Sequence, residues 1–501
     1  MPRPIPGWSL TSRALLAGGL LLAAAAGLSG QSLAERLDRR LDAPGLEHLL
    51  WGVAVTDLDG HLLFGRNADR LFVPASNTKL VVSITANAML GPSFTVRTSV
   101  FGTGPLANGV LEGDLILYGR GDPTFSRRCY AADTTQPGVC DRDPAAKLHQ
   151  LAQQLHDRGV RAVAGDIVGD GSYFTPEIIH PGWETYDLGW WYAAPVSGLG
   201  FNDNSVDFHE VPGASSGATP LLVMTPDLGA FTLDNRGETG PSGSRRSFDI
   251  FRSVDGLSYL ATGSLPAGAP PRDESAAVLD PNRYAAIAFR HELAAVGIVV
   301  RGDTRSTLDS FTYQAARSSP PLAEVTSRPL RDWLYPILSP SQNWFAEMLL
   351  KQLGRHFGSA GSWEEGRRVE RRFLIDSVRI DSTEFSLQDG SGLASNNFVT
   401  PLAFTRLLTW ARKHANFAAI YAGLPASGKP GTLRDRFAGT PAATAVHAKT
   451  GSISGVNTLS GFVERPDGRV LVFSVMANHQ IIGGTRMLAA IDSVVVELAR
   501  P

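Results

Sequence analysis

The chain has 501 residues, of which 43% are hydrophobic and 19% are charged. At about 150 residues per domain, this length suggests roughly three domains and ample chain for a large core. The 46 basic and 48 acidic residues give a formal net charge of −2. This balance argues against a nucleic-acid-binding protein, which needs a basic excess, and the ordinary apolar fraction argues against a disordered chain.

The N-terminus has the pattern of a secretory signal. Arg3 and Arg13 precede an apolar run over residues 14–28, which is shorter than a membrane-spanning helix and typical of a signal core. We therefore expect residues 1–30 to be a signal peptide and the protein to be periplasmic or otherwise exported. An uncleaved N-terminal anchor is the alternative. No later stretch is long and apolar enough to span a bilayer.

Two cysteines occur in the sequence, Cys129 and Cys140, and loop-like residues flank both. In an exported protein this pair predicts one disulfide that closes a short loop, worth roughly 3 kcal/mol in the loop-entropy description. A metal or redox role would need closer spacing or partner ligands, and the sequence offers neither.

In chain order, the first predicted elements are two strands at 51–57 and 62–67, separated by the turn residues Asp59 and Gly60. A helix is predicted over 77–90. Short strands follow at 111–118 and 160–168, and the Gly-, Ser- and Pro-rich stretch 210–275 predicts a loop-rich β insertion. The next helix is predicted over 283–296, ending at Gly297.

The last third of the chain predicts helices at 342–353 and 402–414. Three strands follow at 445–450, 458–463 and 469–477, and a closing helix at 485–498. Strands near both chain ends, together with these helices, suggest one α+β domain assembled from the two termini. The middle of the chain would then be inserted into this domain.

The first chemical signal is Ser76-Asn77-Thr78-Lys79, the only Ser-x-x-Lys in the sequence. At positions i and i+3 of a helix, the hydroxyl and the amine lie on one face. Serine is a good nucleophile only when a base removes its proton. Lys79 can be that base if burial and a second cation lower its pKa toward neutrality. An exposed helical pair is the alternative for this motif taken alone.

Two further signals follow in order. Ser341-Gln342-Asn343 places a hydroxyl and a carboxamide two positions apart, suited to relaying protons and binding an amide, although a simple helix N-cap at Ser341 is the alternative. On a predicted strand, Lys449-Thr450-Gly451-Ser452 puts Lys449 and Gly451 on one face. The cation can hold a carboxylate, the glycine admits a close backbone, and an N–H near Ser452 can complete an oxyanion hole.

These motifs together resemble the three-motif set of the serine penicillin-recognising enzymes. Further stretches occur in order and narrow the resemblance: Gly121-Asp122-Pro123-Thr124, Gly165-Asp166-Ile167-Val168, Asn202-Asp203-Asn204, Asp389-Gly390-Ser391-Gly392-Leu393 and residues 449–456. From about residue 35 to its C-terminus, the chain resembles the class C low-molecular-mass penicillin-binding proteins, the D-alanyl-D-alanine carboxypeptidase/endopeptidase family.

The resemblance implies an α+β fold with a penicillin-binding/β-lactamase-like transpeptidase domain, an antiparallel sheet flanked by helices and built from both chain ends. Two nested β-rich domains would fill the 265-position gap between Ser76 and Ser341. We expect the catalytic domain at 31–95 and 320–501, the first inserted domain at 96–205 and 280–319, and the second at 206–279. The gap in β-lactamases is far shorter, which disfavours that activity.

The resemblance also implies the chemistry. Ser76 would be acylated by a peptidoglycan stem peptide and release D-alanine, with Lys79 accepting its proton and Ser341 relaying a proton to the leaving amine. A β-lactam would acylate Ser76 in the same way and leave slowly. The family needs no metal and no organic cofactor.

Substrate binding is implied for the remaining motif residues. Asn343 would bind the substrate amide, Lys449 and Thr450 the terminal carboxylate, and Gly451 and Ser452 would lie along the substrate, with the N–H groups of Ser76 and Ser452 facing the oxyanion. Two departures from the family pattern occur. Ala394-Ser395 replaces the usual Ser-Arg after Leu393, which weakens inference about substrate side chains, and Gln342 replaces the usual Asp or Asn.

Two alternatives stay open at this stage. Trimming of terminal D-alanine and cleavage of D-Ala–diaminopimelate cross-links are not distinguished by the sequence, and a non-catalytic peptidoglycan-binding scaffold on the same fold is the rival outside enzymes. The tryptophans Trp183, Trp190 and Trp191 offer either a glycan surface or core packing. Core packing is the expectation.

Overall fold

One sheet of the protein is built from both ends of the chain. In the computed structural model, which describes residues 31–501, the strand order is β2-β1-β24-β23-β22 and all neighbours are antiparallel. The strands are β1 (Leu50–Thr56), β2 (Leu62–Arg66), β22 (Val446–Ile453), β23 (Val456–Glu464) and β24 (Val470–Asn478). The predicted strands therefore form in one sheet, as expected. The predicted signal peptide, residues 1–30, lies outside the described residues.

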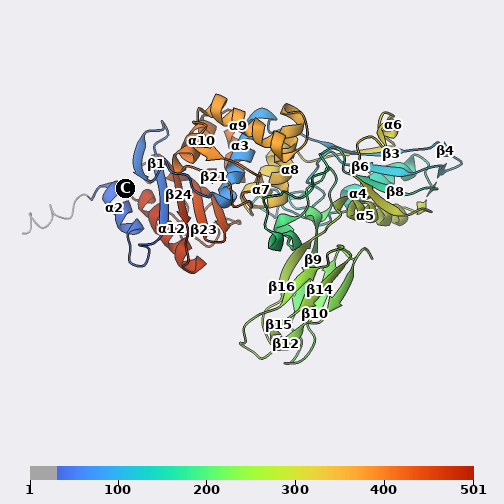
Figure 1. The fold of residues 1–501 in the computed structure, drawn as a ribbon, viewed down its shortest axis with the longest axis horizontal. Helices are drawn as coiled ribbons and strands as arrows, with labels where there is room; N and C mark the ends of the chain where they lie inside the picture. The colour runs from blue at the N-terminus through green and yellow to red at the C-terminus, as the bar shows by residue number, and fades with distance from the viewer. Residues whose placement is uncertain (1–30) are drawn as a thin grey trace, which may run out of the picture.

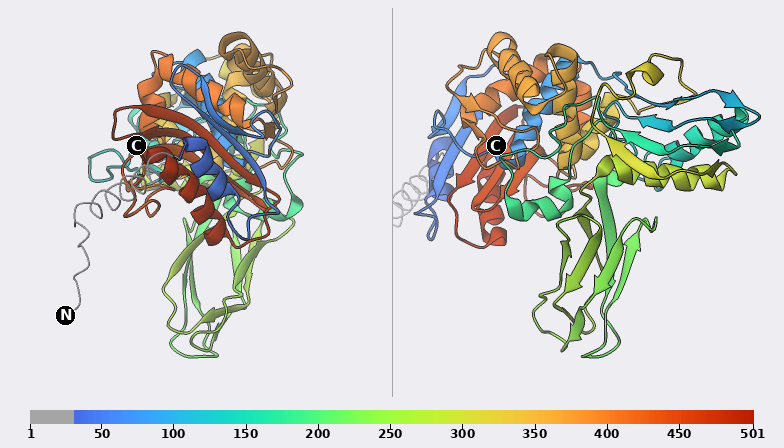
Figure 2. Two further views of the ribbon diagram at one scale, coloured as in Figure 1. Left: turned by 90° about the vertical axis from the view of Figure 1, so that its left-hand side faces the viewer. Right: turned by 45° about the vertical axis from the view of Figure 1, so that its right-hand side comes forward.

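Helices cover both faces of this sheet (Figures 1 and 2). The terminal helices α2 (Leu33–Leu41) and α12 (Gly484–Ala499) pack together on one face. The other face carries a helical layer, which comprises α3 (Thr78–Met89), α7 (Leu330–Leu338), α8 (Asn343–Phe357), α9 (Trp363–Phe373), α10 (Pro401–Lys413) and α11 (Phe417–Gly423). Because α3 and α8 lie inside this layer, even their polar residues Lys79, Glu347 and Lys351 are buried. The α+β class predicted from the sequence is confirmed.

Short elements connect these helices to the sheet. They are the 3₁₀ helix η1 (Ala75–Asn77), the π-helical turn η5 (Leu374–Val378) and the paired strands β20 (Phe385–Ser386) and β21 (Phe398–Val399). The loop between β20 and β21 contains the Asp389–Leu393 stretch singled out in the sequence. It lies against the start of α3, which places it beside Lys79.

A second lobe contains mixed sheets together with helices (Figure 1). Its five-stranded sheet has the order β18-β8-β6-β3-β19 and a smaller sheet the order β17-β7-β5-β4. The strands are β3 (Arg97–Gly102), β4 (Leu106–Ala107), β5 (Val110–Leu111), β6 (Leu115–Tyr118), β7 (Ala162–Val163), β8 (Ile167–Asp170), β17 (Val299–Val300), β18 (Thr304–Thr307) and β19 (Ala323–Thr326). The helices are α4 (Ala146–Asp157), α5 (Pro281–Ala295) and α6 (Gln314–Arg317).

The single strands predicted at 111–118 and 160–168 are wrong, because each stretch forms two strands in different sheets. A Gly-Asp pair interrupts both stretches, at Asp114 and Asp166. Arg305 Nη2 donates to Asp114 Oδ2 at 2.6 Å, and Arg305 Nε donates to Asp166 Oδ2 at 2.7 Å. The two interruptions are thus tied to one guanidinium, which fixes where the chain passes from one sheet to the other.

The third lobe is a β arm that projects from the other two (Figures 1 and 2). Its sheets have the orders β10-β9-β16, β11-β14-β13 and β12-β15. The strands are β9 (Ser205–Val211), β10 (Leu221–Thr225), β11 (Thr232–Asn235), β12 (Glu238–Gly240), β13 (Asp249–Arg252), β14 (Ser258–Thr262), β15 (Ser264–Pro266) and β16 (Arg272–Ala277). The β-rich insertion predicted for 210–275 therefore forms, in a slightly longer stretch.

The 3₁₀ helices η2 (Thr185–Gly189), η3 (Trp191–Ala193) and η4 (Asn202–Asn204) lie where the three lobes meet. The predicted disulfide is present, with the Cα atoms of Cys129 and Cys140 4.0 Å apart. Among residues 31–501, every helix is too short or too polar to cross a membrane.

Candidate active site

The three sequence motifs converge on one cleft of about 460 Å³. Ser76 lies in η1 just before α3, Ser341 and Asn343 stand at the start of α8, and Ser452 lies on the edge strand β22. The lining consists of Ser76, Glu184, Asp187, Trp191, Tyr192, Pro340, Ser341, Asn343, Gly392, Leu393, Ser395, Ser452, Ile453 and Ser454. Segments more than 350 residues apart in sequence thus form a single site.

Lys79 lies directly behind the candidate nucleophile. Its Nζ is 2.8 Å from Ser76 Oγ, 2.7 Å from Asn343 Oδ1 and 2.8 Å from the carbonyl oxygen of Ser391. The side chain is fully buried. Burial lowers the pKa of Lys79 to about 7, although the carboxylates of Glu347 and Asp389 act in the opposite direction. A substantial fraction of Lys79 is therefore neutral near pH 7.

Lys449 brings a second buried lysine to the site. Its Nζ donates to Ser341 Oγ at 2.9 Å and to the carbonyl oxygen of Thr450 at 2.7 Å. Burial, and then the charge of Lys79, hold the pKa of Lys449 well below its ordinary value. The hydroxyls of Ser76 and Ser341 are thus each in contact with a buried lysine. Ser76 contacts Lys79 of the Ser-x-x-Lys motif, and Ser341 contacts Lys449 of the Lys-Thr-Gly motif.

Gly451 faces the segment that carries the nucleophile, which differs from the expectation that it admits a substrate backbone. A Cβ at this position would lie 2.2 Å from Thr458 Oγ1, 2.7 Å from the carbonyl oxygen of Pro74 and 3.1 Å from the nitrogen of Ser76. Only glycine lets β22 approach η1 this closely. The Thr450 side chain, half-buried, donates to Thr432 Oγ1 at 3.0 Å.

The backbone is left-handed at Ser341 and at the residue before Ser76. Ala75 has φ +47° and Ser341 has φ +66°. These conformations cost free energy for a residue with a side chain, and they cluster at functional sites. Ala75 is held by the loop after β20, since a Cβ at Gly392 would lie 1.9 Å from its carbonyl oxygen. Ser341 does not cap α8, because the N-cap is Gln342, whose Oε1 accepts from the Trp344 N–H at 3.0 Å.

Glu347, Asp389 and Ser391 also shape the site, although the sequence motifs assign no role to any of them. Glu347, fully buried, accepts from the N–H groups of Gly390 and Ser391 at 3.0 and 2.7 Å. Asp389 accepts from the N–H groups of Gly392 and Ala394 at 2.8 and 2.7 Å. Together they shape the loop whose Ser391 carbonyl binds Lys79. Glu347 follows Asn343 by one helical turn, a spacing that points to the same face of α8.

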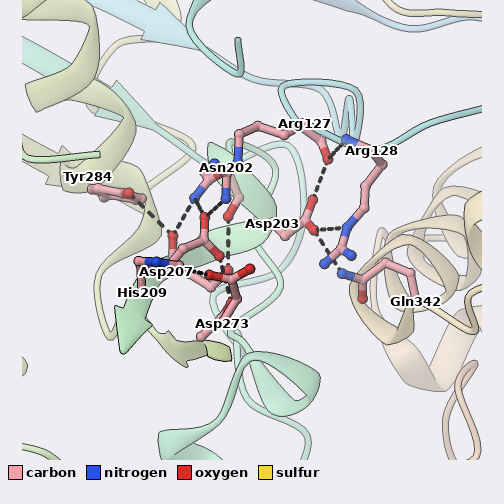
Figure 3. A network of polar contacts seen from close by, with 12 residues as sticks. Arg127, Arg128, Asn202, Asp203, Asp207, His209, Asp273, Tyr284 and Gln342 are labelled. Atoms are coloured by element: carbon pink, nitrogen blue, oxygen red, sulfur yellow. Dashed lines mark hydrogen bonds and ion pairs between the residues drawn. The ribbon is translucent and has the colours of Figure 1, made fainter. Parts of the chain in front are cut away.

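A polar network ties the Ser341-Gln342-Asn343 motif to the junction of the inserted lobes (Figure 3). Asp203 Oδ2 accepts from Gln342 Nε2 at 2.9 Å and from Arg128 Nε at 2.5 Å. Asn202, Asp203 and Asn204 all have left-handed backbones, which Asn and Asp tolerate better than most residues. The Asn-Asp-Asn stretch therefore turns a carboxylate toward the residue between Ser341 and Asn343.

Two acidic residues, Glu184 and Asp187, belong to the cleft lining, and Ser395 lies there too. Within residues 31–501, one cluster of metal-ligating side chains is found, Asp57, Asp59 and His61 in the exposed turn between β1 and β2, outside the cleft. A larger cavity of about 550 Å³, beside the disulfide, includes Asp203 in its lining but none of the three motifs.

The fold and the three motifs define a penicillin-recognising serine enzyme. Comparison with known proteins places it more closely: the chain belongs to the D-Ala-D-Ala carboxypeptidase 3 (S13) family, which it matches over residues 33–500. This is the family expected from the sequence, and it makes the protein a serine-type carboxypeptidase by class.

Individual relatives agree with this assignment. The chain is 33% identical to a D-alanyl-D-alanine carboxypeptidase of Actinomadura sp. (strain R39), over 97% of this chain and 88% of that protein. It is 25% identical to the D-alanyl-D-alanine carboxypeptidase DacB of Haemophilus influenzae, over 83% and 82%. The crystal structure of penicillin-binding protein 4 from Haemophilus influenzae has the same fold, with a TM-score of 0.77 at 23% identity, covering 93% of this chain and 99% of that one.

Proposed function

We propose that this protein cleaves the terminal D-Ala-D-Ala bond of peptidoglycan stem peptides through an acyl-enzyme on Ser76. The observation that carries the proposal is the buried contact of 2.8 Å between Lys79 Nζ and Ser76 Oγ, in a site where burial lowers the pKa of Lys79 to about 7. An amine that is neutral near physiological pH can accept the serine proton, and an exposed lysine cannot do so efficiently.

In the acylation step, neutral Lys79 accepts the Ser76 hydroxyl proton as Oγ attacks the carbonyl carbon of the penultimate D-alanine. The N–H groups of Ser76 and Ser452 are the proposed donors to the oxygen that becomes negative. Lys79 returns the proton through Ser341 to the leaving nitrogen, the C–N bond breaks, and D-alanine departs. Water then attacks the ester carbonyl, and its proton passes back to Ser76 Oγ as the acid product leaves.

Substrate binding falls to the neighbouring motif residues. Lys449 and Thr450 are proposed to hold the terminal carboxylate, whose negative charge favours the protonated form of Lys449 once the substrate is bound. Asn343 Oδ1 accepts from Lys79 and retains a second lone pair for the amide N–H of the substrate. Gly451 supports this arrangement indirectly, because it lets β22 lie against the nucleophile segment.

Two features favour an amino-group-bearing stem peptide as the substrate. Glu184 and Asp187 line the cleft, and the arginine that the family pattern places in the loop after Gly392 is replaced by Ser395. The side chain of a diamino acid in the stem would bring a complementary ammonium. β-Lactams are proposed as covalent inhibitors, since the Haemophilus influenzae protein of the same fold has been crystallised in complex with one.

DD-endopeptidase activity on cross-links is proposed alongside carboxypeptidase activity. The chemistry at Ser76 is the same in both cases, and only the group attached to the leaving amine differs. Release of D-alanine from a linear pentapeptide, compared with cleavage of a cross-linked peptide dimer, measures the balance between the two. Rapid turnover of nitrocefin would instead indicate a β-lactamase.

We extend the proposal to the location and division of the chain. Export, with residues 1–30 as signal peptide, places the enzyme where peptidoglycan is found. The catalytic unit is proposed to comprise residues 31–95 and 320–501, with inserted domains at 96–205 and 280–319 and at 206–279. β19 (Ala323–Thr326) pairs with β3, which suggests that the chain returns to the catalytic unit a few residues after 319.

The decisive experiment is labelling of the purified protein with fluorescent penicillin, beside Ser76→Ala, with mass mapping of the adduct. A stable adduct on Ser76 that the variant lacks is the expected result. A folded protein that gives no adduct would refute the acyl-enzyme and favour the rival interpretation, a non-catalytic peptidoglycan-binding scaffold on this fold.

A further inference from the structure

Segment 184–192 separates the catalytic cleft from a second cavity. Asp187 and Trp191 line the cleft, whereas Tyr186 and Trp190 line a cavity of about 240 Å³ at the base of the β arm. Neighbouring Cα atoms are about 3.8 Å apart, so each of these pairs of consecutive residues spans the wall between the two cavities. The second cavity is therefore adjacent to the catalytic site, although none of the three motifs reaches it.

The structure fixes this wall at both ends. On the arm side, Trp190 forms a β-bridge with Ala276, and Arg252 Nη2 donates to the carbonyl oxygen of Leu188 at 3.0 Å. On the catalytic side, Asn343 Nδ2 donates to the carbonyl oxygen of Tyr192 at 2.7 Å. Backbone contacts thus tie the wall to both the β arm and the catalytic unit, as two subsites for one ligand require.

Aromatic rings dominate the apolar part of the second cavity. Tyr186 is 67% exposed, and Trp190 is half-buried beside it. Phe248 also lines the cavity but is only 4% exposed, and the guanidinium of Arg246 lies 5.8 Å from its ring centroid. Trp183, in contrast, is buried in the core and donates to Asp389. The expectation of core packing therefore holds for Trp183 only.

The polar part of the cavity consists of ordered charged pairs. Arg246 Nη1 donates to Glu210 Oε2 at 2.7 Å, and Arg272 pairs with Glu274. Glu210 is 1% exposed, and its Oε1 has no hydrogen-bond partner among residues 31–501. A buried acceptor left without a donor costs free energy unless a ligand supplies one. With Asp249 included, three carboxylates face two guanidiniums, which opposes an anionic ligand.

We propose that this cavity binds one sugar ring of the glycan strand that carries the stem peptide. The exposed ring of Tyr186, with half-buried Trp190 in the same cavity, matches the apolar face of a pyranose. The charged pairs offer donors and acceptors for neutral hydroxyl and acetamido groups. The volume is below the about 300 Å³ of typical small-molecule sites, so it suits a single ring. The proposal rests on the proposed function, since the stem peptide then crosses the wall into the cleft.

Hydrolysis of two matched substrates tests the proposal. One is the free pentapeptide, and the other is the same pentapeptide attached to its disaccharide. We expect Tyr186→Ala and, separately, Arg272→Ala to lower kcat/KM for the disaccharide substrate about tenfold, through KM, and to leave the free peptide unchanged. Phe311→Ala removes another exposed aromatic ring, 77% exposed and outside both cavities, and is the matched control.

Other outcomes overturn the proposal. Equal effects of Tyr186→Ala on both substrates would show that the cavity serves the peptide or the fold. A selective effect on a saccharide-free cross-linked dimer would assign it to a second peptide strand. If the protein hydrolyses neither substrate and Ser76 takes no penicillin, the proposed function fails. Binding to the saccharide site is then measured separately, by tryptophan fluorescence with a peptide-free N-acetylglucosamine trimer. Saturable quenching that is lost in Tyr186→Ala supports the site, and the absence of quenching refutes it.

Discussion

At Lys79, a single buried amine has three acceptor atoms within 2.8 Å. An ammonium group can donate to all three, whereas a neutral amine has two hydrogens and one lone pair. The neutral form therefore donates to Asn343 Oδ1 and the Ser391 carbonyl, both of which lack a hydrogen to give, and accepts from Ser76. The surroundings of Lys79 direct its lone pair to the one neighbour that has a proton to transfer.

This arrangement predicts an acid limb in the pH dependence of acylation. Because Lys79 must be neutral and its pKa is lowered to about 7, the rate rises with pH through about 7 and then levels. The second-order rate constant for fluorescent penicillin, measured between about pH 5 and pH 9, checks this. In Lys79→Arg the side chain cannot lose its proton, and we expect a loss of roughly 10²- to 10⁴-fold. A wild-type rate that is flat across this range would contradict the assignment of Lys79 as the base.

Glu370 gives a second pH prediction, in stability. Neither carboxyl oxygen has a hydrogen-bond partner within residues 31–501, and burial raises the pKa of Glu370 well above its ordinary value, with Glu347 adding to the shift. The folded state keeps a proton that the unfolded state releases above about pH 4.5. Wild-type stability therefore falls as pH rises past that value.

In Glu370→Gln this contribution is absent, because the amide does not titrate. Above about pH 4.5 we expect the free energy of unfolding of the variant to rise relative to that of the wild type, by at most about 1.4 kcal/mol per pH unit. Below that pH the variant should show no such relative gain. Urea unfolding at pH 4.5 and pH 8 measures the difference. A stability difference that is the same at both pH values would disprove the buried titration.

Among the elements, the start of α8 depends on contacts from outside the catalytic unit. Ser341 is left-handed at φ +66°, and Gln342 beside it is held by Asp203 from the junction of the inserted lobes. The same carboxylate also accepts from Ser126 and Arg128, so its position does not depend on Gln342. Asp203 is thus a positioning residue for the two side chains that flank Gln342.

We predict that Asp203→Ala slows acylation of Ser76 by about tenfold. A hydrogen bond to a charged group contributes about 1.5–3 kcal/mol, and without it Ser341 and Asn343 are held less firmly in place. Gln342→Ala should slow it at least as much, because this variant also loses the Oε1 cap on the Trp344 N–H. The double variant should be no slower than Gln342→Ala, since the contact with Asp203 is already absent there. Asp207→Ala, which breaks the ion pair with Arg127 in the same network, is the control. Additive losses in the double variant would argue against coupling through this hydrogen bond.

The sequence predicted some helices and missed others in both the catalytic unit and the insertions. The catalytic strands and α3, α8, α10 and α12 follow clear periodicity, as does α5 in the insertion, whereas α7, α9 and α11 were missed. The insertion helix α4 was also missed, although Leu148, Leu151, Ala152 and Leu155 mark its buried face. The side chains of the three motifs were predictable because side-chain chemistry identifies them. The Ser391 carbonyl and the contact of Gly451 with η1 were not, since backbone groups and close approaches leave no signature in residue type.

For the whole molecule, the helical core belongs to more than one lobe. The largest hydrophobic cluster contains the buried side chains of α3, α7, α8 and α9, and it also includes Phe174, Val196 and Ala277 from the inserted segments. A separate cluster fills the insertions and includes Phe208. The insertions therefore contribute packing to the catalytic unit, in addition to any contact with substrate.

This sharing predicts different consequences for two equally buried phenylalanines. Phe174→Ala and Phe208→Ala each remove a ring that is at most 2% exposed, which typically costs about 3–5 kcal/mol. We expect Phe174→Ala to lower the urea concentration at which Ser76 loses penicillin labelling, because the cavity opens in the core shared with the catalytic helices. Phe208→Ala should instead make the β arm more sensitive to limited proteolysis and leave the labelling midpoint close to that of the wild type. If both variants shift the labelling midpoint equally, the lobes unfold as one cooperative unit. If neither does, the inserted segments do not stabilise the catalytic core.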